Sequence, residues 1–195
     1  MTMILASASP RRQELLRQVG CDFKVIASDV DEDNKWSSSP AELAVSLAVA
    51  KALDVAKKAA ADDVVLGADT IVVMDGQVYG KPADDADACR MLGELAGRRH
   101  QVITGIAVAT AGRVWTDFAV TAVTFRDLTR SEIERYVASG EPRDKAGSYA
   151  IQGIGALFVE GIEGCYANVV GLPLATLDKL LGQALGVSLL EYPSG

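Results

Sequence analysis

Residues 64–79 read VVLGADTIVVMDGQVY, and this stretch decides the fold. Residues 64–74 are mostly apolar and rich in β-branched side chains, which favours a buried strand. Asp75-Gly76 is a strong signal for a two-residue hairpin turn, and it leads into a second apolar run at residues 77–79. We therefore predict a long central strand that turns back on itself.

On both sides of this stretch, short apolar runs alternate with amphipathic segments. Further strands are predicted at residues 3–6, 23–27, 101–110, 113–125 and 156–159. Helices are predicted at residues 10–19, 40–60, 84–95, 129–140 and 173–185, two of them opened by the capping-box patterns SPAE and TRSE. The mixture of crossovers and hairpins, the latter including a turn at Ala111-Gly112, predicts an α/β fold with a mixed β-sheet flanked by helices.

The length of 195 residues suits a single domain spanning residues 1–195, or one domain with a modest second lobe. No apolar run reaches the roughly 18 residues that a membrane span needs. The N-terminal sequence MTMILASASPRRQELL places its arginines after a very short apolar stretch, the reverse of a secretory signal. The expected location is the cytoplasm, with no membrane partner.

The cysteine and histidine content excludes several kinds of site. Cys21, Cys89 and Cys165 are odd in number and widely spaced, so we expect buried thiols rather than disulfides or a thiolate zinc site. His100 is the only histidine, so an imidazole zinc site and a serine protease triad lack their usual parts. A catalytic metal would have to be bound by oxygen. The net charge of −7 disfavours a nucleic-acid duplex as partner but leaves a small, metal-complexed polyanion open.

The sequence SASPRR at residues 7–12 joins a predicted strand directly to a helix, with Ser9 as N-cap and Pro10 at the first helical position. A helix N-terminus offers free backbone N–H groups and a positive dipole end, and Arg11 and Arg12 add two guanidinium groups. This pattern indicates a phosphate site. The alternative is an ordinary capped helix with two solvated arginines.

Two charged residues lie within patterns that should be buried. Lys51 follows Leu43 and Leu47 at helical spacing, so it shares their core-facing stripe; the alternative is a lysine that snorkels to solvent. Asp69 interrupts the apolar run of residues 64–74, where a carboxylate is costly unless it is paired or bound to metal. The alternative for Asp69 is a loop between two shorter strands.

The remaining candidates give weaker signals. Glu32 lies in a run of three acidic residues and is a candidate second metal ligand, although such runs are usually solvated. Lys81 stands between Gly80 and Pro82, a rigid turn that would fix its direction. Lys145 and Gln152 flank the glycine-punctuated stretch DKAGSYAIQGIG, which permits close approach of backbone to a ligand.

Taken together and in order, the motifs resemble the Maf family of nucleoside triphosphate pyrophosphatases over nearly the whole chain. The motifs that carry the resemblance are SASPRR, Glu32, Lys51, GADT at 67–70, GKP at 80–82, DKAGSYAIQG at 144–153 and VVGLP at 169–173. The resemblance implies an elongated Maf/ITPase-like fold with a central cleft for the nucleotide, a divalent metal (Mg²⁺ or Mn²⁺) and a homodimer.

The resemblance also implies roles for single residues. Asp69 would accept a proton and, with Glu32, bind the metal. Phosphate contacts would come from Ser7, Arg12, Lys51 and Lys81. A departure is Val49, where relatives often carry a charged residue shortly before the lysine.

Within the family, Arg11, Thr70 and Gln152 resemble the branch that hydrolyses dTTP and UTP to the monophosphate and pyrophosphate. The other branch, which prefers 7-methyl-GTP, typically has Trp, Gln and Glu at these places. A glutamine amide, with a donor and an acceptor, suits the edge of uracil or thymine. Two alternatives stay open: a 7-methyl-GTP pyrophosphatase, and a nucleotide-binding regulator of septum formation.

Overall fold

A computed structural model describes residues 2–30 and 39–190. The strands are β1 (Met3–Leu5), β2 (Lys24–Val25), β3 (Val64–Met74), β4 (Gln77–Tyr79), β5 (Arg99–Thr110), β6 (Arg113–Phe125) and β7 (Val159–Glu163). The α-helices are α1 (Pro10–Gln18), α2 (Pro40–Ala56), α3 (Asp85–Leu95), α4 (Arg130–Ala138), α5 (Tyr166–Val170) and α6 (Leu174–Leu185). Three 3₁₀ turns, η1 (Glu141–Asp144), η2 (Ala146–Ser148) and η3 (Ile154–Phe158), lie between α4 and β7.

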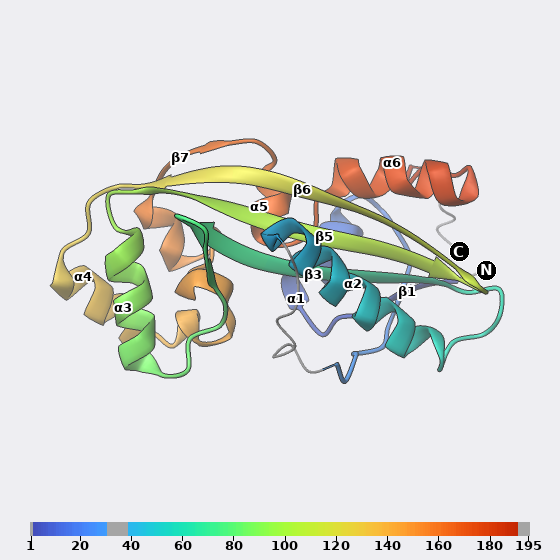
Figure 1. Cartoon of the computed structure of the whole chain (residues 1–195), viewed down its shortest axis with the longest axis horizontal. Coiled ribbons are helices and arrows are strands. Elements are labelled where there is room, and N and C mark those ends of the chain that lie inside the picture. Colours follow the sequence, from blue (N-terminus) through green and yellow to red (C-terminus); the bar gives the residue numbers. More distant parts are fainter. Residues whose placement is uncertain (1, 31–38, 191–195) are drawn as a thin grey trace. The chain divides into compact units, whose positions relative to one another are not determined.

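Within the described residues, the strands form one seven-stranded sheet in the order β2-β1-β3-β5-β6-β7, with β4 paired to β3 (Figure 1). β1 pairs in parallel with both β2 and β3, whereas β3–β4 and β6–β7 are antiparallel. The predicted mixed sheet flanked by helices is therefore confirmed. In the same described residues no helix has the length and apolar character needed to cross a membrane.

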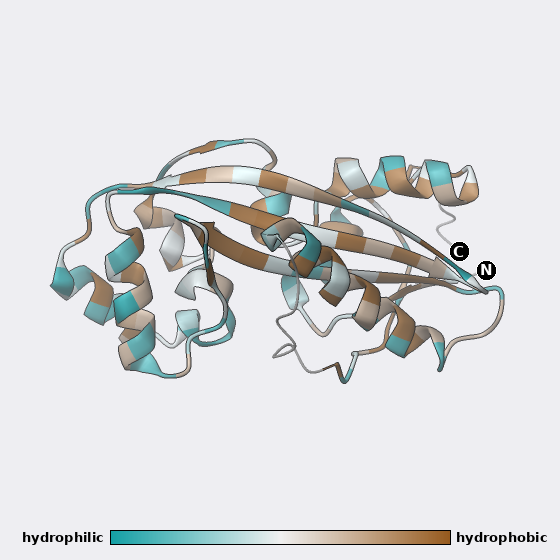
Figure 2. Ribbon diagram, in the orientation of Figure 1, coloured by the Kyte–Doolittle hydropathy of each residue, from teal (hydrophilic) through white to brown (hydrophobic). Residues whose placement is uncertain are grey.

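The chain divides into two compact units whose boundary on β3 falls between Asp69 and Thr70. The first unit contains residues 1–69, 104–119 and 171–195, and the second contains residues 70–103 and 120–170. Each unit has its own apolar core, because each packs helices onto its own part of the strands. Figure 2 shows the apolar residues running along the strands, while the helices carry mixed apolar and polar faces.

In the first unit, α2 packs on β3 and β5 through small residues and glycines. The core here comprises Ile4, Ala6, Ala48, Ala52, Val55, Val65, Ala107 and Ala109. A Cβ atom on Gly67 would lie 2.1 Å from the carbonyl oxygen of Ala48, and one on Gly105 would lie 2.4 Å from the backbone nitrogen of Val45. These two glycines therefore allow the α2 backbone to approach the sheet closely.

In the second unit, α3 and α4 lie side by side (Figure 1). Their apolar faces join a core that contains several large residues, among them Tyr79, Met91, Phe125, Tyr136, Tyr149 and Phe158. The predicted capping box is present on α4, where the side chain of Thr129 accepts from the Glu132 backbone and Glu132 bonds back. It satisfies backbone groups that would otherwise lack helical partners.

Several predicted boundaries were wrong. The strand predicted at residues 156–159 is instead the 3₁₀ turn η3 followed by β7, because Ala156 N bonds to Gly153 O and the chain becomes extended only from Val159. The second predicted strand is shortened to β2, and α5 was not predicted. α2 ends at Ala56 rather than near residue 60, since tight turns follow it. Cys21 is buried as expected, but Cys89 and Cys165 are only half-buried.

The core of the second unit contains His100, which is only 2% exposed. Its Nε2 lies 2.8 Å from the hydroxyl of Tyr149, and its ring meets Phe125 edge-on at 4.8 Å between centroids. Burial lowers the pKa of His100 from 6.5 to about 4, because the charged imidazolium loses its hydration. The same burial raises the pKa of Tyr149. Both groups are therefore neutral in the native protein near neutral pH.

We predict that acid destabilises the fold through His100. The unfolded chain binds a proton with the ordinary pKa of 6.5 while the native state resists it down to about 4, so stability is complete above pH 6.5 and falls as the pH drops towards 4. The free energy of unfolding in urea should be lower by about 2 kcal/mol at about pH 5 than at about pH 7.5. In His100→Gln this slope should vanish. An equal slope in both proteins would contradict the assignment.

Candidate functional site

The first candidate residues follow the segments through which the parallel strands β1 and β3 pair. Leu5 of β1 is level with Leu66 of β3, and Ala6 N continues the pairing by donating to Leu66 O at 2.8 Å. Ser7 and Asp69 therefore follow the paired segments at the same end of neighbouring strands. In open α/β sheets this end is where ligands generally bind.

Asp69 and Lys51 form a buried ion pair in the first unit. The Lys51 Nζ lies 2.6 Å from Asp69 Oδ1, and the two residues are 8% and 6% exposed. The snorkelling alternative for Lys51 and the loop alternative for Asp69 are therefore both wrong, because Lys51 lies on the core face of α2 and Asp69 lies inside the continuous strand β3. Burying two charges costs desolvation free energy. Removing one partner of such a pair strongly destabilises the folded protein, because the other charge stays buried without compensation.

Gly67 explains how Lys51 reaches Asp69. Alternate residues of a strand point to the same face, so Gly67 and Asp69 share the face of β3 that packs on α2. Because Gly67 has no side chain, α2 lies against the strand at Ala48 and Ala52, and Lys51 between them is brought within bonding distance of Asp69. The motif at 67–70 thus combines a packing residue with a charged one.

Arg12 is buried rather than solvated. It is 9% exposed, its Nε donates to the carbonyl oxygen of Gly171 at 2.8 Å, and its NH1 donates to Ser7 Oγ at 3.1 Å. Residues 159 positions apart are therefore joined by one guanidinium group. Ser7 also accepts from the backbone of Ser9 at 3.2 Å. The sequence patterns did not indicate the Gly171 contact, which depends on tertiary structure; Arg11 beside it is half-exposed.

The N-terminus of α1 has the properties of an anion-binding end. Ser9 occupies the N-cap position and Pro10 the first turn, as predicted, but the Ser9 side chain makes no capping hydrogen bond. The first turn of α1 also contains no acidic residue. The positive end of the helix dipole is therefore opposed by no carboxylate of its own first turn, and Arg11 and Arg12 add positive charge to it.

In the second unit, Lys81 lies beside the glycine-rich segment of residues 144–153. Gly147 N donates to Gly80 O at 3.0 Å, which fixes this segment against the turn that carries Lys81. Lys81 is exposed. β3 and β4 pair Val72 with Tyr79, and extension of this register by two residues brings Lys81 level with Thr70.

Gln152 is half-exposed between the buried Ile151 and the exposed Gly153. Lys145 has a side chain that is 11% exposed and is paired with Asp144. Gly147 and Ser148 both have positive φ, and a Cβ on Gly147 would lie 2.8 Å from Val72 Cγ2, so the segment packs tightly on β3. Its shape is therefore set by backbone packing as well as by side chains.

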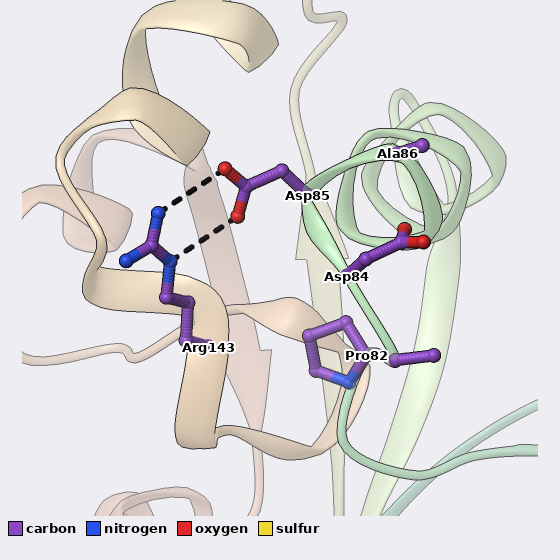
Figure 3. Close-up of a pocket in the computed structure, with 6 residues that line it drawn as sticks. Pro82, Asp84, Asp85, Ala86 and Arg143 are labelled. Atoms are coloured by element: carbon purple, nitrogen blue, oxygen red, sulfur yellow. Dashed lines mark hydrogen bonds and ion pairs between the residues drawn. The ribbon is translucent and has the colours of Figure 1, made fainter.

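Immediately after Lys81, a pocket of about 500 Å³ is lined by Pro82, Ala83, Asp84, Asp85, Ala86 and Arg143. Figure 3 shows Arg143 reaching Asp85 through two hydrogen bonds, each 3.2 Å long. The positive charge of the Arg143 guanidinium is thereby balanced by the Asp85 carboxylate, and Asp84 adds a second carboxylate to the pocket. This lining does not suit a polyanion, so we do not place the phosphate site here.

The described residues contain no group of three His, Cys, Asp or Glu side chains that could hold a metal ion. Glu32, predicted as a metal ligand with Asp69, lies outside the described residues. In the first unit the structure joins Ser7 to Arg12 and Lys51 to Asp69. Thr70, Lys81 and Gln152 belong to the second unit. The convergence of both groups on one nucleotide stays a prediction.

The chain is similar in sequence to several named proteins. A relative from Gloeobacter violaceus, named dTTP/UTP pyrophosphatase, is 52% identical over 93% of this chain and 95% of its own length. A Moorella thermoacetica protein of the same name is 54% identical over 92% of this chain and 93% of its own. Among solved structures, a HAM1 protein from Coxiella burnetii covers 78% of this chain and 88% of its own at 17% identity, with a TM-score of 0.46.

The family assignment depends on the sequence relatives and on the family model rather than on the distant structural match. The model of the family described as "Maf-like protein" matches residues 2–184, which include every motif that carried the resemblance. The chain belongs to the Maf family.

Proposed function

We propose that this chain hydrolyses nucleoside triphosphates to the monophosphate and pyrophosphate, with dTTP and UTP as substrates. The observation that carries the proposal is the buried pair of Lys51 and Asp69, which places a carboxylate and an ammonium group 2.6 Å apart in the middle of β3, beyond the segment that pairs with β1. Charged side chains are almost never fully buried unless they are paired, and a buried pair of this kind marks a candidate functional site. The names of the relatives support the same activity.

The triphosphate would be held by positive groups from both ends of the sequence. Arg12 and Ser7, beside the uncapped N-terminus of α1, offer fixed donors, because the guanidinium is anchored to Gly171 O. Lys51, whose ammonium group is held by Asp69, and the exposed Lys81 would add two more positive charges. Phosphoryl transfer depends mainly on positioning and on compensation of phosphate charge, so a prearranged set of cations can supply most of the acceleration.

Asp69 is the proposed proton acceptor for the water that attacks the α-phosphorus. The water loses its proton to the carboxylate as the new P–O bond forms, and the bond between the α-phosphorus and the bridging oxygen breaks to release pyrophosphate. Lys51 holds Asp69 Oδ1 and so fixes the orientation of the carboxylate. A base held rigidly within reach of its proton is the geometric requirement for general-base catalysis.

A divalent cation, Mg²⁺ or Mn²⁺, fits this chemistry. Mg²⁺ is commonly bound by one or two carboxylates together with substrate phosphates, so a site built from Asp69, Glu32 and the nucleotide needs no preformed cage. When bound, the cation offsets the negative charge of the phosphate oxygens. Buried in a strand, Asp69 offers the oxygen donor that these cations prefer.

Arg11, Thr70 and Gln152 are the proposed determinants of the base. The amide of Gln152 can both donate to and accept from a pyrimidine edge, and its half-exposed position leaves it accessible to a nucleotide. This combination supports dTTP and UTP over 7-methyl-GTP. The net charge of −7 favours a free nucleotide over a nucleic-acid duplex as partner. We also propose that the chain is a single domain, that it acts in the cytoplasm and that it forms a homodimer.

The proposal predicts the products of a simple assay. The purified protein, given dTTP, UTP, 7-methyl-GTP or dATP with Mg²⁺ or Mn²⁺, should release pyrophosphate and monophosphate most rapidly from dTTP and UTP. Ion chromatography separates these products from a diphosphate and phosphate. Chelation of the cation should stop the reaction. Faster turnover of 7-methyl-GTP would place the protein in the other branch, and tight binding of dTTP without turnover would indicate a regulator.

A further inference from the structure

The carboxylate of Glu141 accepts three hydrogen bonds in the second unit. Its Oε1 accepts from the hydroxyl of Tyr136 at 2.9 Å and from the backbone of Gly155 at 3.1 Å, and its Oε2 accepts from the backbone of Ile154 at 3.1 Å. Hydrogen bonds to an ionised acceptor are stronger than those between neutral groups. Glu141 therefore fixes two successive backbone amides that follow Gln152 by two and three residues.

Tyr136 holds the other end of the same segment. Its hydroxyl, which donates to Glu141, also accepts from Ala150 N at 3.2 Å. The Tyr136 side chain is only 2% exposed and belongs to the core of the second unit, whereas Glu141 is half-exposed. Gln152 thus lies between two points, Ala150 and Ile154, that are held by one connected pair of side chains. A network of this kind rigidifies the backbone that it binds.

Gly153, the residue after Gln152, shows how closely the carboxylate is seated. Its φ of +84° and ψ of −148° lie in a region that only glycine adopts readily. A Cβ at this position would lie 2.6 Å from Glu141 Oε2. The chain therefore turns sharply around the carboxylate directly after Gln152, and the turn leaves no room for a side chain at position 153.

We propose that Glu141 is a positioning residue for base recognition: through Tyr136 and the amides of residues 154 and 155, it fixes the backbone that presents Gln152 to the nucleobase. This inference rests on the proposed function of Gln152. It assigns a role to a residue outside the family motifs described above, and the role does not require Glu141 to touch the substrate.

The test compares Glu141→Gln with Glu160→Gln, which alters an exposed carboxylate on β7 of the same unit. In Glu141→Gln one carboxylate oxygen becomes an NH₂ group that faces a backbone N–H, so one bond is lost and two donors oppose each other. Amide hydrogen exchange at residues 150–155 of the nucleotide-free protein should become faster by about tenfold or more. In Glu160→Gln it should stay at the original rate. Unchanged exchange in Glu141→Gln would overturn the proposal.

The second readout is base preference, measured by calorimetry as the ratio of the Kd values for dAMP and dTMP, which requires no turnover. Gln152→Ala and Glu141→Gln should each lower the preference for dTMP about tenfold, and the double variant should lose little more, because both changes act through the same contact. The affinity for inorganic tripolyphosphate, which has no base, should be unchanged in Glu141→Gln.

Two results would oppose the inference on this second readout. A preference for dTMP that survives in Glu141→Gln, or a fall in tripolyphosphate affinity equal to the fall in dTMP affinity, would show that Glu141 does not act through base recognition. Neither result depends on catalysis. Failure of the proposed function would appear separately, as wild-type protein that releases no pyrophosphate from dTTP.

Discussion

Asp69→Asn is expected to lower kcat for dTTP hydrolysis by a factor of about 100 to 10,000, the usual contribution of a general base. The amide cannot accept the proton of the attacking water. KM should change much less, because the proposed phosphate contacts come from Ser7, Arg12, Lys51 and Lys81. The measurement is steady-state release of pyrophosphate over a range of dTTP concentrations, with the cation in excess.

The fold should survive this substitution. Asn keeps an oxygen that can accept from Lys51 Nζ, now 2.6 Å from Asp69 Oδ1, so the buried ammonium retains a partner. The thermal midpoint should therefore fall far less than in Asp69→Ala, which removes the carboxylate that accepts the 2.6 Å hydrogen bond from the buried Lys51 ammonium. Glu160→Gln, at an exposed carboxylate, serves as the activity control. Normal turnover by folded Asp69→Asn would show that another group accepts the proton.

The central strand was predictable because its signal is local. Residues 64–74 are long, β-branched and followed by Asp75-Gly76, whose φ values of 51° and 78° are those that a tight hairpin turn requires. The same local pattern made Asp69 conspicuous, since a carboxylate among buried β-branched residues requires a partner. Lys51 was found by helical spacing from Leu43 and Leu47. Pattern alone could not pair Lys51 with Asp69, because that contact requires α2 to cross β3.

Features set by tertiary contacts were not predictable in this way. The strand predicted at residues 156–159 was wrong because the preceding turn is shaped by Glu141 and Gly153, and no periodicity records that contact. Arg12 was predicted as a phosphate ligand from the helix start, but no local pattern indicated its bond to Gly171 O, which links two ends of the chain. Such long-range hydrogen bonds follow from the assembled sheet. The sequence therefore indicated which charged residues are candidates for the site, and the structure added the hydrogen bonds and ion pairs that these residues make.

Gly67 connects the fold to the site, and Gly67→Ala is expected to damage both. The new Cβ would lie 2.1 Å from Ala48 O and 2.9 Å from the Ala52 nitrogen, which are backbone atoms of α2 and cannot rotate away. Relief requires α2 to move off β3. We expect a loss of about 3 kcal/mol in the free energy of unfolding, as in strongly overpacked cores. The displacement of α2 also carries Lys51 away from Asp69.

Because an error of about 1 Å in a catalytic arrangement can cost about 100-fold in rate, kcat of folded Gly67→Ala should fall by about that factor. The matched control is Gly93→Ala, an exposed glycine within α3 whose added Cβ would meet nothing within 4 Å. That change should stabilise the protein by up to about 1 kcal/mol, because alanine favours the helix, and should leave kcat unaltered. Urea unfolding of both variants measures the change in the free energy of unfolding, and dTTP turnover measures the change in kcat. If Gly67→Ala matched the wild type in both, α2 would not depend on this glycine for its close approach, and the link between sheet packing and the Lys51–Asp69 pair would be lost.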